Sequence, residues 1–455
     1  MKKLPIENCG LQIENWVLAR TSSHMRSEIS NLKFQISNFK FQLLLLVTAL
    51  LIFPALISAQ TPPATGIRLL DLDGKQTDAG PLTQWSEGVL FFEGKPTIRA
   101  PAADLHKLHW TGRKLRTAVW PVVLLANGDR LQLKVESIDG EQLVGRWASD
   151  VSSTQSNDPA DFGSWFSIKV PLESVRGIIV TQPTDRAVRD RTISQLLDRT
   201  DRSDVVILNN GDTVEGELLG VESKILKLKT NVGESSIDLA GVRAIGFNPE
   251  LTNMPPAAEG SALVTLLDGS RFQAAKFKLS TDAKKLSLQA RFGANLEIPL
   301  EAVASLQFTG GRITYLSEIQ PAAYKSEPYF SLEWPLRRDR SVLGGPLRLR
   351  GAEYARGLGM HSQSEVRYQL DGKYRRFHTT IGIDDDAHGR GSVVFKIVCD
   401  DRVVFASPVL TGTSRPATLE PIDVTGMKTL TLRVEFADFG DIQDHANWCD
   451  AVLVK

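Results

Sequence analysis

Hydrophobic and polar positions alternate through most of the chain after about residue 66. Segments such as Leu226-Lys-Leu228-Lys and Leu286-Ser-Leu288-Gln have the two-residue period of half-buried strands. In the last third of the chain, Val393, Phe395 and Ile397 fall on one face of an expected strand. The pattern predicts a mainly β protein that is made of many short strands.

Four related segments follow one another between residues 66 and 310. Each opens with an apolar run that ends in a turn pair: Asp73-Gly74, Asn127-Gly128, Asn210-Gly211 and Asp268-Gly269. Such pairs tolerate a positive φ at both central positions, so each predicts a tight hairpin. The segments also close alike, as in Pro171-Leu-Glu-Ser-Val175 and Pro299-Leu-Glu-Ala-Val303. The pattern is similar to that of small SH3-like or Sm-like barrels. We therefore expect tandem barrel-like repeats. This likeness assigns no functional residue.

One segment, residues 184–200, has a helical period instead. Its apolar side chains fall on one side of a helix: Val188, Ile193, Leu196 and Leu197. Its charged side chains are expected in solvent: Arg186, Arg189, Asp190 and Arg191. The segment therefore predicts a solvated helical connector between the second and the third repeat.

The apolar run from Leu43 to Ile57 does not belong to the β pattern. Basic residues precede it and a small pair follows it: Arg26, Lys33, Lys40 and Ser58-Ala59. Its 15 residues are fewer than the ~20 that cross a bilayer core, which favours a secretory signal over a membrane anchor. We expect cleavage near Ala59, an extracytoplasmic (secreted or periplasmic) protein, and no integral membrane segment in the mature chain. Met25 is an alternative start to Met1.

Charge and cysteine content narrow the partners and the compartment. The 53 Lys and Arg residues balance 53 Asp and Glu residues, and loss of residues 1–59 leaves 47 against 50. A slightly acidic exported chain is not expected to bind nucleic acid. Two cysteines remain, Cys399 and Cys449, either as a disulfide or as two buried thiols.

The last part of the chain carries five blocks that resemble one known family. They are G-A-E-Y-A-R-G-L-G-M-H-S (351–362), Y-Q-L-D-G-K-Y-R-R-F (368–377), I-G-I-D-D-D (381–386), G-S-V-V-F-K-I (391–397) and D-H-A-N-W-C-D-A (444–451). Their order and spacing resemble the NPCBM family of carbohydrate-binding modules, which often accompany glycoside hydrolases. The resemblance covers about residues 327–455 and implies a galactose-binding-like jelly-roll β-sandwich. Two departures are Asp400-Asp401, where the family usually has Asp-Gly, and Cys449, where it commonly has Ala.

A sugar needs an aromatic surface for its C–H face and polar groups for its hydroxyls. The family blocks supply both, and the candidate carbohydrate-binding residues are Tyr354, His361, Asp384, Asp385, Asp444, His445, Asn447 and Trp448. The alternatives are that these residues build the fold, or that the sugar lies on Trp334 or Phe439. Strand alternation places Trp448, Asp450, Val452 and Val454 on one face, opposite Cys449, Ala451 and Leu453, after a polar loop at 444–447. We therefore expect Asp444→Ala or His445→Ala to weaken glycan binding with little loss of stability.

Other chemistry has weaker support in the sequence. There is no H-E-x-x-H, G-x-S-x-G, Walker or paired C-x-x-C motif, although Asp385 with Asp444 has the composition of a two-carboxylate hydrolase pair. The acidic loops could hold a structural Ca²⁺, and no other cofactor is expected. The arginines Arg337, Arg338, Arg340, Arg348 and Arg350 are read as a solvated face rather than an acidic-polymer site.

These observations divide the chain into five parts: a signal peptide (1–59), a first pair of repeats (60–183), a helical connector (184–203), a second pair (204–323) and the β-sandwich (324–455). We expect an exported, non-catalytic protein whose sandwich binds a glycan or polysaccharide. The repeats would serve as a spacer or as a docking surface for a protein partner. The alternatives are a structural envelope protein without sugar binding and, less favoured, a glycoside hydrolase.

Overall fold

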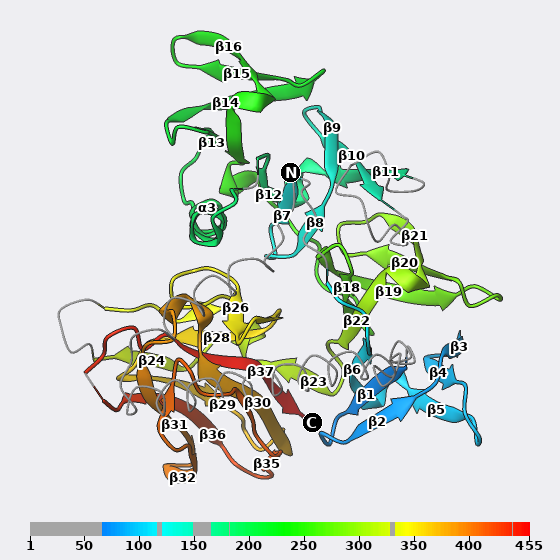
Figure 1. The fold of residues 1–455 in the computed structure, drawn as a ribbon, viewed down its shortest axis with the longest axis vertical. Helices are drawn as coiled ribbons and strands as arrows, with labels where there is room; N and C mark the ends of the chain where they lie inside the picture. The colour runs from blue at the N-terminus through cyan, green and yellow to red at the C-terminus, as the bar shows by residue number, and fades with distance from the viewer. Residues whose placement is uncertain (1–65, 116–120, 149–164, 182, 328–332, 439) are drawn as a thin grey trace, which may run out of the picture. The chain divides into compact units, whose positions relative to one another are not determined.

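The computed structural model describes residues 66–455 except 116–120, 149–164, 182, 328–332 and 439 (Figure 1). The expected signal peptide and its cleavage site lie outside these residues. The described part is mainly β with one α-helix, α3 (Arg186–Leu197), as the hydrophobic period predicts. No helix within this part is long and apolar enough to span a bilayer.

The four repeats share one strand plan. The first strand pairs with the second across the glycine turn, and its other edge pairs with the last strand, which follows a short 3₁₀ turn. The first repeat consists of β1 (Ile67–Asp71), β2 (Gln76–Ala79), β3 (Leu82–Ser86), β4 (Val89–Phe92), β5 (Ile98–Pro101), η2 (Ala102–Asp104) and β6 (Leu105–Trp110). The second consists of β7 (Val122–Leu125), β8 (Arg130–Gln132), β9 (Lys134–Ile138), β10 (Gln142–Ala148), β11 (Trp165–Pro171), η4 (Leu172–Ser174) and β12 (Val175–Ile179).

The third and fourth repeats follow the same order after α3. The third consists of β13 (Asp204–Leu208), β14 (Thr213–Glu222), β15 (Ile225–Thr230), β16 (Gly233–Asp238), η5 (Leu239–Gly241) and β17 (Val242–Gly246), with η6 (Pro249–Leu251) behind it. The fourth consists of β18 (Ala262–Leu266), β19 (Arg271–Leu279), β20 (Lys285–Ala290), β21 (Asn295–Pro299), η7 (Leu300–Ala302) and β22 (Val303–Phe308). Among the described strands, the strand before each 3₁₀ turn pairs with the strand that precedes it and not with the strand after the turn. The likeness to small barrels therefore extends to the strand order, while the sheets themselves are open.

The glycine turns differ in detail from the expectation. The expected hairpins are confirmed, and Gly128 has φ +83° and Gly211 has φ +98°, whereas the asparagines before them do not have positive φ. Instead the Asn127 side chain accepts from the Asp129 amide at 3.2 Å, and Asn210 accepts from the Asp212 amide at 3.0 Å. The side chain closes the turn, and only the glycine needs the left-handed conformation.

The last strands also join the repeats to one another. Strand β6 pairs with β22, with Leu108 opposite Leu306, and β12 pairs with β17, with Ile178 opposite Ile245. The first repeat is thus joined to the fourth and the second to the third. Helix α3 packs its apolar side on the latter pair, where Leu196 is fully buried.

Charged side chains join α3 to the C-terminal part of the chain. The Asp190 carboxylate accepts from both terminal nitrogens of Arg348, a residue that is 8% exposed. Asp198 pairs with Arg337 at 2.9 Å and with Arg340 at 2.6 Å. The expected solvated faces of the helix and of the arginine cluster are therefore wrong at these positions, because each charge meets an opposite charge from the other element.

The C-terminal part is a sandwich of two antiparallel sheets. One sheet contains β23 (Ile313–Tyr315), β25 (Arg337–Arg338), β28 (Gly357–Met360), β30 (Arg376–Ile383), β34 (Ala417–Thr418), β35 (Ile422–Asp423) and β37 (Ala446–Val454). The other contains β24 (Ala323–Ser326), β29 (Ser364–Gln369), β31 (Ser392–Cys399), β32 (Arg402–Ala406), β33 (Leu410–Thr411) and β36 (Thr429–Phe436). A hairpin of β26 (Leu347–Leu349) and β27 (Ala352–Tyr354) and the turns η8 (Leu316–Glu318) and η9 (Asp385–Ala387) complete it.

Strand β37 interrupts its own alternation at Asp450. This residue has φ +48°, and the register between β30 and β37 shifts between His378 and Thr380. As a result Trp448, Ala451 and Leu453 lie in the sandwich core, whereas Val452 and Val454 lie in the core of the repeats. The expectation that Trp448 shares a face with the two valines is wrong, because a bulge changes which side each later residue faces.

The two cysteines are free and buried in separate places. Cys399 belongs to the sandwich core, and Cys449 packs with Leu347 and Leu349 on the opposite side of β37. The expected common face of Cys449 with Ala451 and Leu453 is also wrong, for the same reason.

The Trp448 indole is fully buried and meets Phe395 edge to face at 5.0 Å between ring centroids. We predict that Trp448→Ala lowers the free energy of unfolding by about 3–5 kcal/mol, since truncation leaves a cavity in the sandwich core. Urea unfolding of the purified protein measures the loss, with Trp334→Ala, which removes a half-buried indole, as the matched variant. Equal losses for the two variants would contradict this packing.

Candidate functional site

Three blocks that are far apart in sequence meet at one edge of a sheet. The first residue of β37, Ala446, lies between Met360 at the end of β28 and Ile383 at the end of β30. The residues just beyond these strand ends are His361, Asp384 and His445. The Asp384 amide donates to the His445 carbonyl at 2.7 Å, which fixes the two loops together.

Two histidines and a tryptophan form the aromatic part of this edge. The His361 ring stacks on Trp334 with a centroid distance of 4.6 Å and an angle of 8° between the planes. The His445 ring lies 5.8 Å from His361 and 6.1 Å from Trp334. Burial, with a further contribution from His445, lowers the pKa of His361 to about 4, so its imidazole is neutral at physiological pH. Its Nδ1 is buried without a hydrogen-bond partner among the described residues.

Asp386 connects the aromatic part to the neighbouring loop. Its Oδ1 lies 2.7 Å from His445 Nδ1, and its Oδ2 accepts from the Ser341 hydroxyl at 2.9 Å. Sequence reasoning placed Asp386 in an acidic run but did not select it as a sugar ligand. Its position in the sequence could have identified it as a candidate, because it lies two residues after Asp384, just beyond the end of β30.

Asp384 and Asp385 both accept hydrogen bonds from backbone amides. Asp384 is 2% exposed, and its carboxylate accepts from the amides of Asp386 and Arg348, each at 2.9 Å, and from the Asn447 side chain. Asp385 accepts from the amides of Arg350 at 2.8 Å and Gly351 at 2.7 Å. These bonds attach the β26–β27 hairpin to η9 and so shape the loops of the edge.

The residues at the start of β37 are buried as well. Asp444 and Asn447 have no exposed surface, and the Asp444 carboxylate accepts from the Ser392 amide at 2.7 Å. Burial raises the pKa of Asp444 to about 6. The expected exposed loop at 444–447 is therefore wrong. An alanine at 444 would leave a buried amide without its acceptor, so a loss of stability is expected there.

Two of the sequence-selected residues lie away from this edge. Trp448 is in the sandwich core, where its Nε1 has no hydrogen-bond partner among the described residues. Tyr354 packs against Leu347, Leu349 and Cys449. Phe439, an alternative aromatic surface, lies outside the described residues. The edge thus brings together His361, Asp384 and His445 with Asn447 and Asp444 beside them, and it adds Trp334 and Asp386.

The acidic residues near this edge are the candidate calcium ligands and the candidate hydrolase pair. In residues 66–455 outside the gaps, no group of three or more His, Cys, Asp or Glu side chains is arranged to hold a metal ion. The structure therefore gives no support for calcium at the acidic loops. Asp385 and Asp444 both accept from backbone amides, which is the arrangement of loop-holding carboxylates.

Comparison with known proteins identifies one domain family in the C-terminal part of the chain. Residues 312–454 match the model of the NPCBM/NEW2 domain. The alpha-1,3-galactosidase B of Akkermansia muciniphila is 32% identical over 117 residues, which are 25% of this chain and 15% of that protein. A Renibacterium salmoninarum protein named for endo-alpha-N-acetylgalactosaminidase activity is 28% identical over 152 residues, 33% of this chain and 10% of that protein. The chain spans no more than about a seventh of either curated relative.

Two solved structures are also similar. The CBM51 module of Clostridium perfringens GH95, in complex with methyl-galactose, is 27% identical and covers 31% of this chain and 99% of its own, with a TM-score of 0.29. The CBM51-2 and INT domains of Clostridium perfringens ZmpB, in complex with GlcNAc, are 24% identical and cover 49% of this chain and 44% of their own, with a TM-score of 0.30.

Burial, followed by the nearby Asp386, raises the pKa of Asp384 from 3.8 to about 7. The folded protein then holds a proton that the unfolded chain releases, so the stabilisation is full below about pH 4 and is lost as the pH rises through 7. Asp384→Asn keeps a capping side chain but cannot ionise. We predict that, between pH 4.5 and 8, the unfolding free energy of the wild type falls relative to Asp384→Asn, by at most about 4 kcal/mol.

Urea unfolding of both proteins at the two pH values measures this difference. The titration of His361 is present in both proteins and cancels. A difference that stays constant between the two pH values would contradict the raised pKa.

Proposed function

Because residues 312–454 are an NPCBM/NEW2 domain, we propose that the protein is an exported, non-catalytic carbohydrate-binding protein. The observation that carries the proposal is the edge where β28, β30 and β37 end. There three of the family blocks bring two imidazoles and a carboxylate together, and Trp334, which precedes the blocks, stacks on one of the imidazoles. The β repeats act as a spacer or docking surface in this proposal.

The chemistry of the edge suits a pyranose. The half-buried Trp334 indole supplies apolar surface for a sugar C–H face, and the buried, neutral His361 ring stacks against it and supports it. The half-buried Asp386 carboxylate can accept from a sugar hydroxyl in addition to its contacts with His445 and Ser341, and the buried His445 imidazole holds it in place. Both curated relatives are named for enzymes that act on galactose or N-acetylgalactosamine, so these are the sugars to test first.

We predict that the purified protein binds galactose- or N-acetylgalactosamine-terminated glycans on an array. Trp334→Ala and His445→Ala should each lower the affinity at least tenfold, since the first removes the apolar surface for the sugar and the second removes the imidazole that positions Asp386. His109→Ala, which removes an exposed histidine of β6, is the matched control and should bind normally. Melting temperatures show whether each variant is folded.

Two results would contradict the proposal. If the wild type binds no glycan on the array, the alternative hypothesis of a structural envelope protein is favoured. Normal binding by folded Trp334→Ala and His445→Ala would place the sugar elsewhere on the chain.

The absence of catalysis is part of the proposal. Its support is that Asp385 and Asp444, the candidate hydrolase pair, are occupied by backbone amides. We predict no release of reducing sugar when the protein is incubated with the glycans that it binds. Turnover that is lost in Asp385→Asn would make the protein a glycoside hydrolase.

Export is proposed from the sequence of residues 25–60. We predict that N-terminal sequencing of the protein from an exporting bacterial host begins at Gln60. A chain that retains Leu43–Ile57 and sediments with membranes would instead indicate an anchor.

A further inference from the structure

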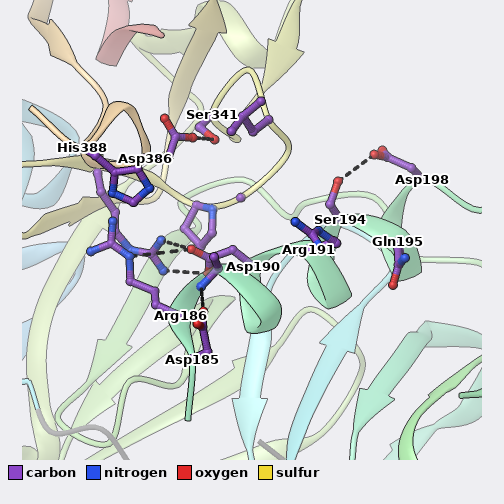
Figure 2. Close-up of a pocket in the computed structure, with 15 residues that line it drawn as sticks. Asp185, Arg186, Asp190, Arg191, Ser194, Gln195, Asp198, Ser341, Asp386 and His388 are labelled. Atoms are coloured by element: carbon purple, nitrogen blue, oxygen red, sulfur yellow. Dashed lines mark hydrogen bonds and ion pairs between the residues drawn. The ribbon is translucent and has the colours of Figure 1, made fainter. Parts of the chain in front are cut away.

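A groove lies between helix α3 and the loops of the sandwich. Its volume is about 820 Å³, which is within the range of pockets that hold small ligands. Figure 2 shows Asp386 and His388 on the sandwich side and Arg186, Asp190 and Arg191 on the helix. The groove borders the proposed carbohydrate site, because Asp386 belongs to both. This residue lines the groove, and its Oδ1 contacts His445 of the carbohydrate site.

Close packing makes the groove a defined feature. A Cβ at Gly344 would lie 2.1 Å from the Ser194 hydroxyl oxygen, and one at Gly345 would lie 3.2 Å from Asp190 Cβ. The buried pair of Asp190 and Arg348 adds an ionic contact at the same place. The loop that contains the two glycines therefore rests directly on the helix.

Helix α3 turns two different faces to its surroundings. Thr192 and Leu196 are buried, with Leu196 against the repeats. Residues at a spacing of three and four line the groove: Ala187, Asp190, Arg191, Ser194 and Asp198. This second face was expected to be solvated, and it is the face that the sandwich meets.

Most charges of the groove are already paired. Asp190 is bound by Arg348, Asp198 by two arginines, and Asp386 by His445 and Ser341. Within the described part of the chain, the side chains of Arg191, Gln195 and His388 have no hydrogen-bond or ion-pair partner, and all three are exposed. Leu343, which is 47% exposed, supplies an apolar surface among them. Because the acidic side chains of the groove are already paired, the free planar polar groups beside an apolar surface suit a ligand that is rich in hydroxyl groups.

We propose that this groove is a second sugar subsite, which takes the next residues of an oligosaccharide whose terminal sugar occupies the strand-end site. The proposal rests on the proposed function. Helix α3, which lies outside the NPCBM/NEW2 match at residues 312–454, then contributes to glycan length selection through Arg191 and Gln195. The intact chain would bind a longer glycan more tightly than the sandwich residues alone allow.

Calorimetry with methyl α-galactoside and with a tetrasaccharide that ends in the same galactose tests this subsite in the full protein. The wild type should bind the tetrasaccharide at least tenfold more tightly than the monosaccharide. Arg191→Ala removes a free donor and Ala187→Trp fills the groove, so each should lower tetrasaccharide affinity at least fivefold and leave monosaccharide affinity unchanged. Arg189→Ala, on the same helix but outside the groove, should bind both as the wild type does.

The outcomes separate the two proposals. Equal wild-type affinity for the two probes would overturn the subsite and leave the proposed function intact. The same would follow if both groove variants kept the wild-type preference for the tetrasaccharide over the monosaccharide. Binding of neither probe by the wild type would overturn the galactose-binding function, and the subsite would fall with it.

Discussion

Strand β37 is the constraint on which the rest of the C-terminal half depends. It pairs with β28, with β30 and with β23, and its side chains enter two different hydrophobic cores. A regular strand could not do this with the apolar sequence that it has, because alternation would send Val452 and Val454 to the side of Trp448. The left-handed backbone conformation of Asp450 shifts the alternation by one residue, so that side chains of one strand pack into both cores.

The same strand explains why the candidate site lies where it does. The start of β37 lies between the ends of two neighbouring strands, so the polar residues at these three ends must gather. Several of them are then used to hold the loops, as the backbone contacts of Asp384, Asp385 and Asp444 show. The groups that the proposed site then uses are Trp334 and Asp386, and the contact from the Asp386 amide to the Asp384 carboxylate fixes the second of them.

Local patterns in the sequence predict the elements but not their partners. A two-residue period follows from burial of one strand face, and so the mainly β class and the helix near residues 184–200 could be predicted and are confirmed in the described part of the chain. The family resemblance is confirmed by the match at residues 312–454. The burial of Asp444 and Asn447 could not be predicted, because it depends on strands that are paired from distant parts of the chain. The pair of Asp190 and Arg348 spans 158 residues, and each side chain alone looks like an ordinary solvated charge.

The two valines at the end of β37 limit how the sandwich can be separated from the chain. Val452 and Val454 are each 1% exposed, and the side chains that cover them belong to the core of the repeats. A fragment cut before β24 would lose β23 from its sheet and would present both valines to water beside an unpaired strand edge. Such an edge is a template for intermolecular strand pairing. The sandwich of this protein is therefore not an independent domain. If it were fused alone to another protein, it would expose an aggregation-prone surface that its own repeats normally cover.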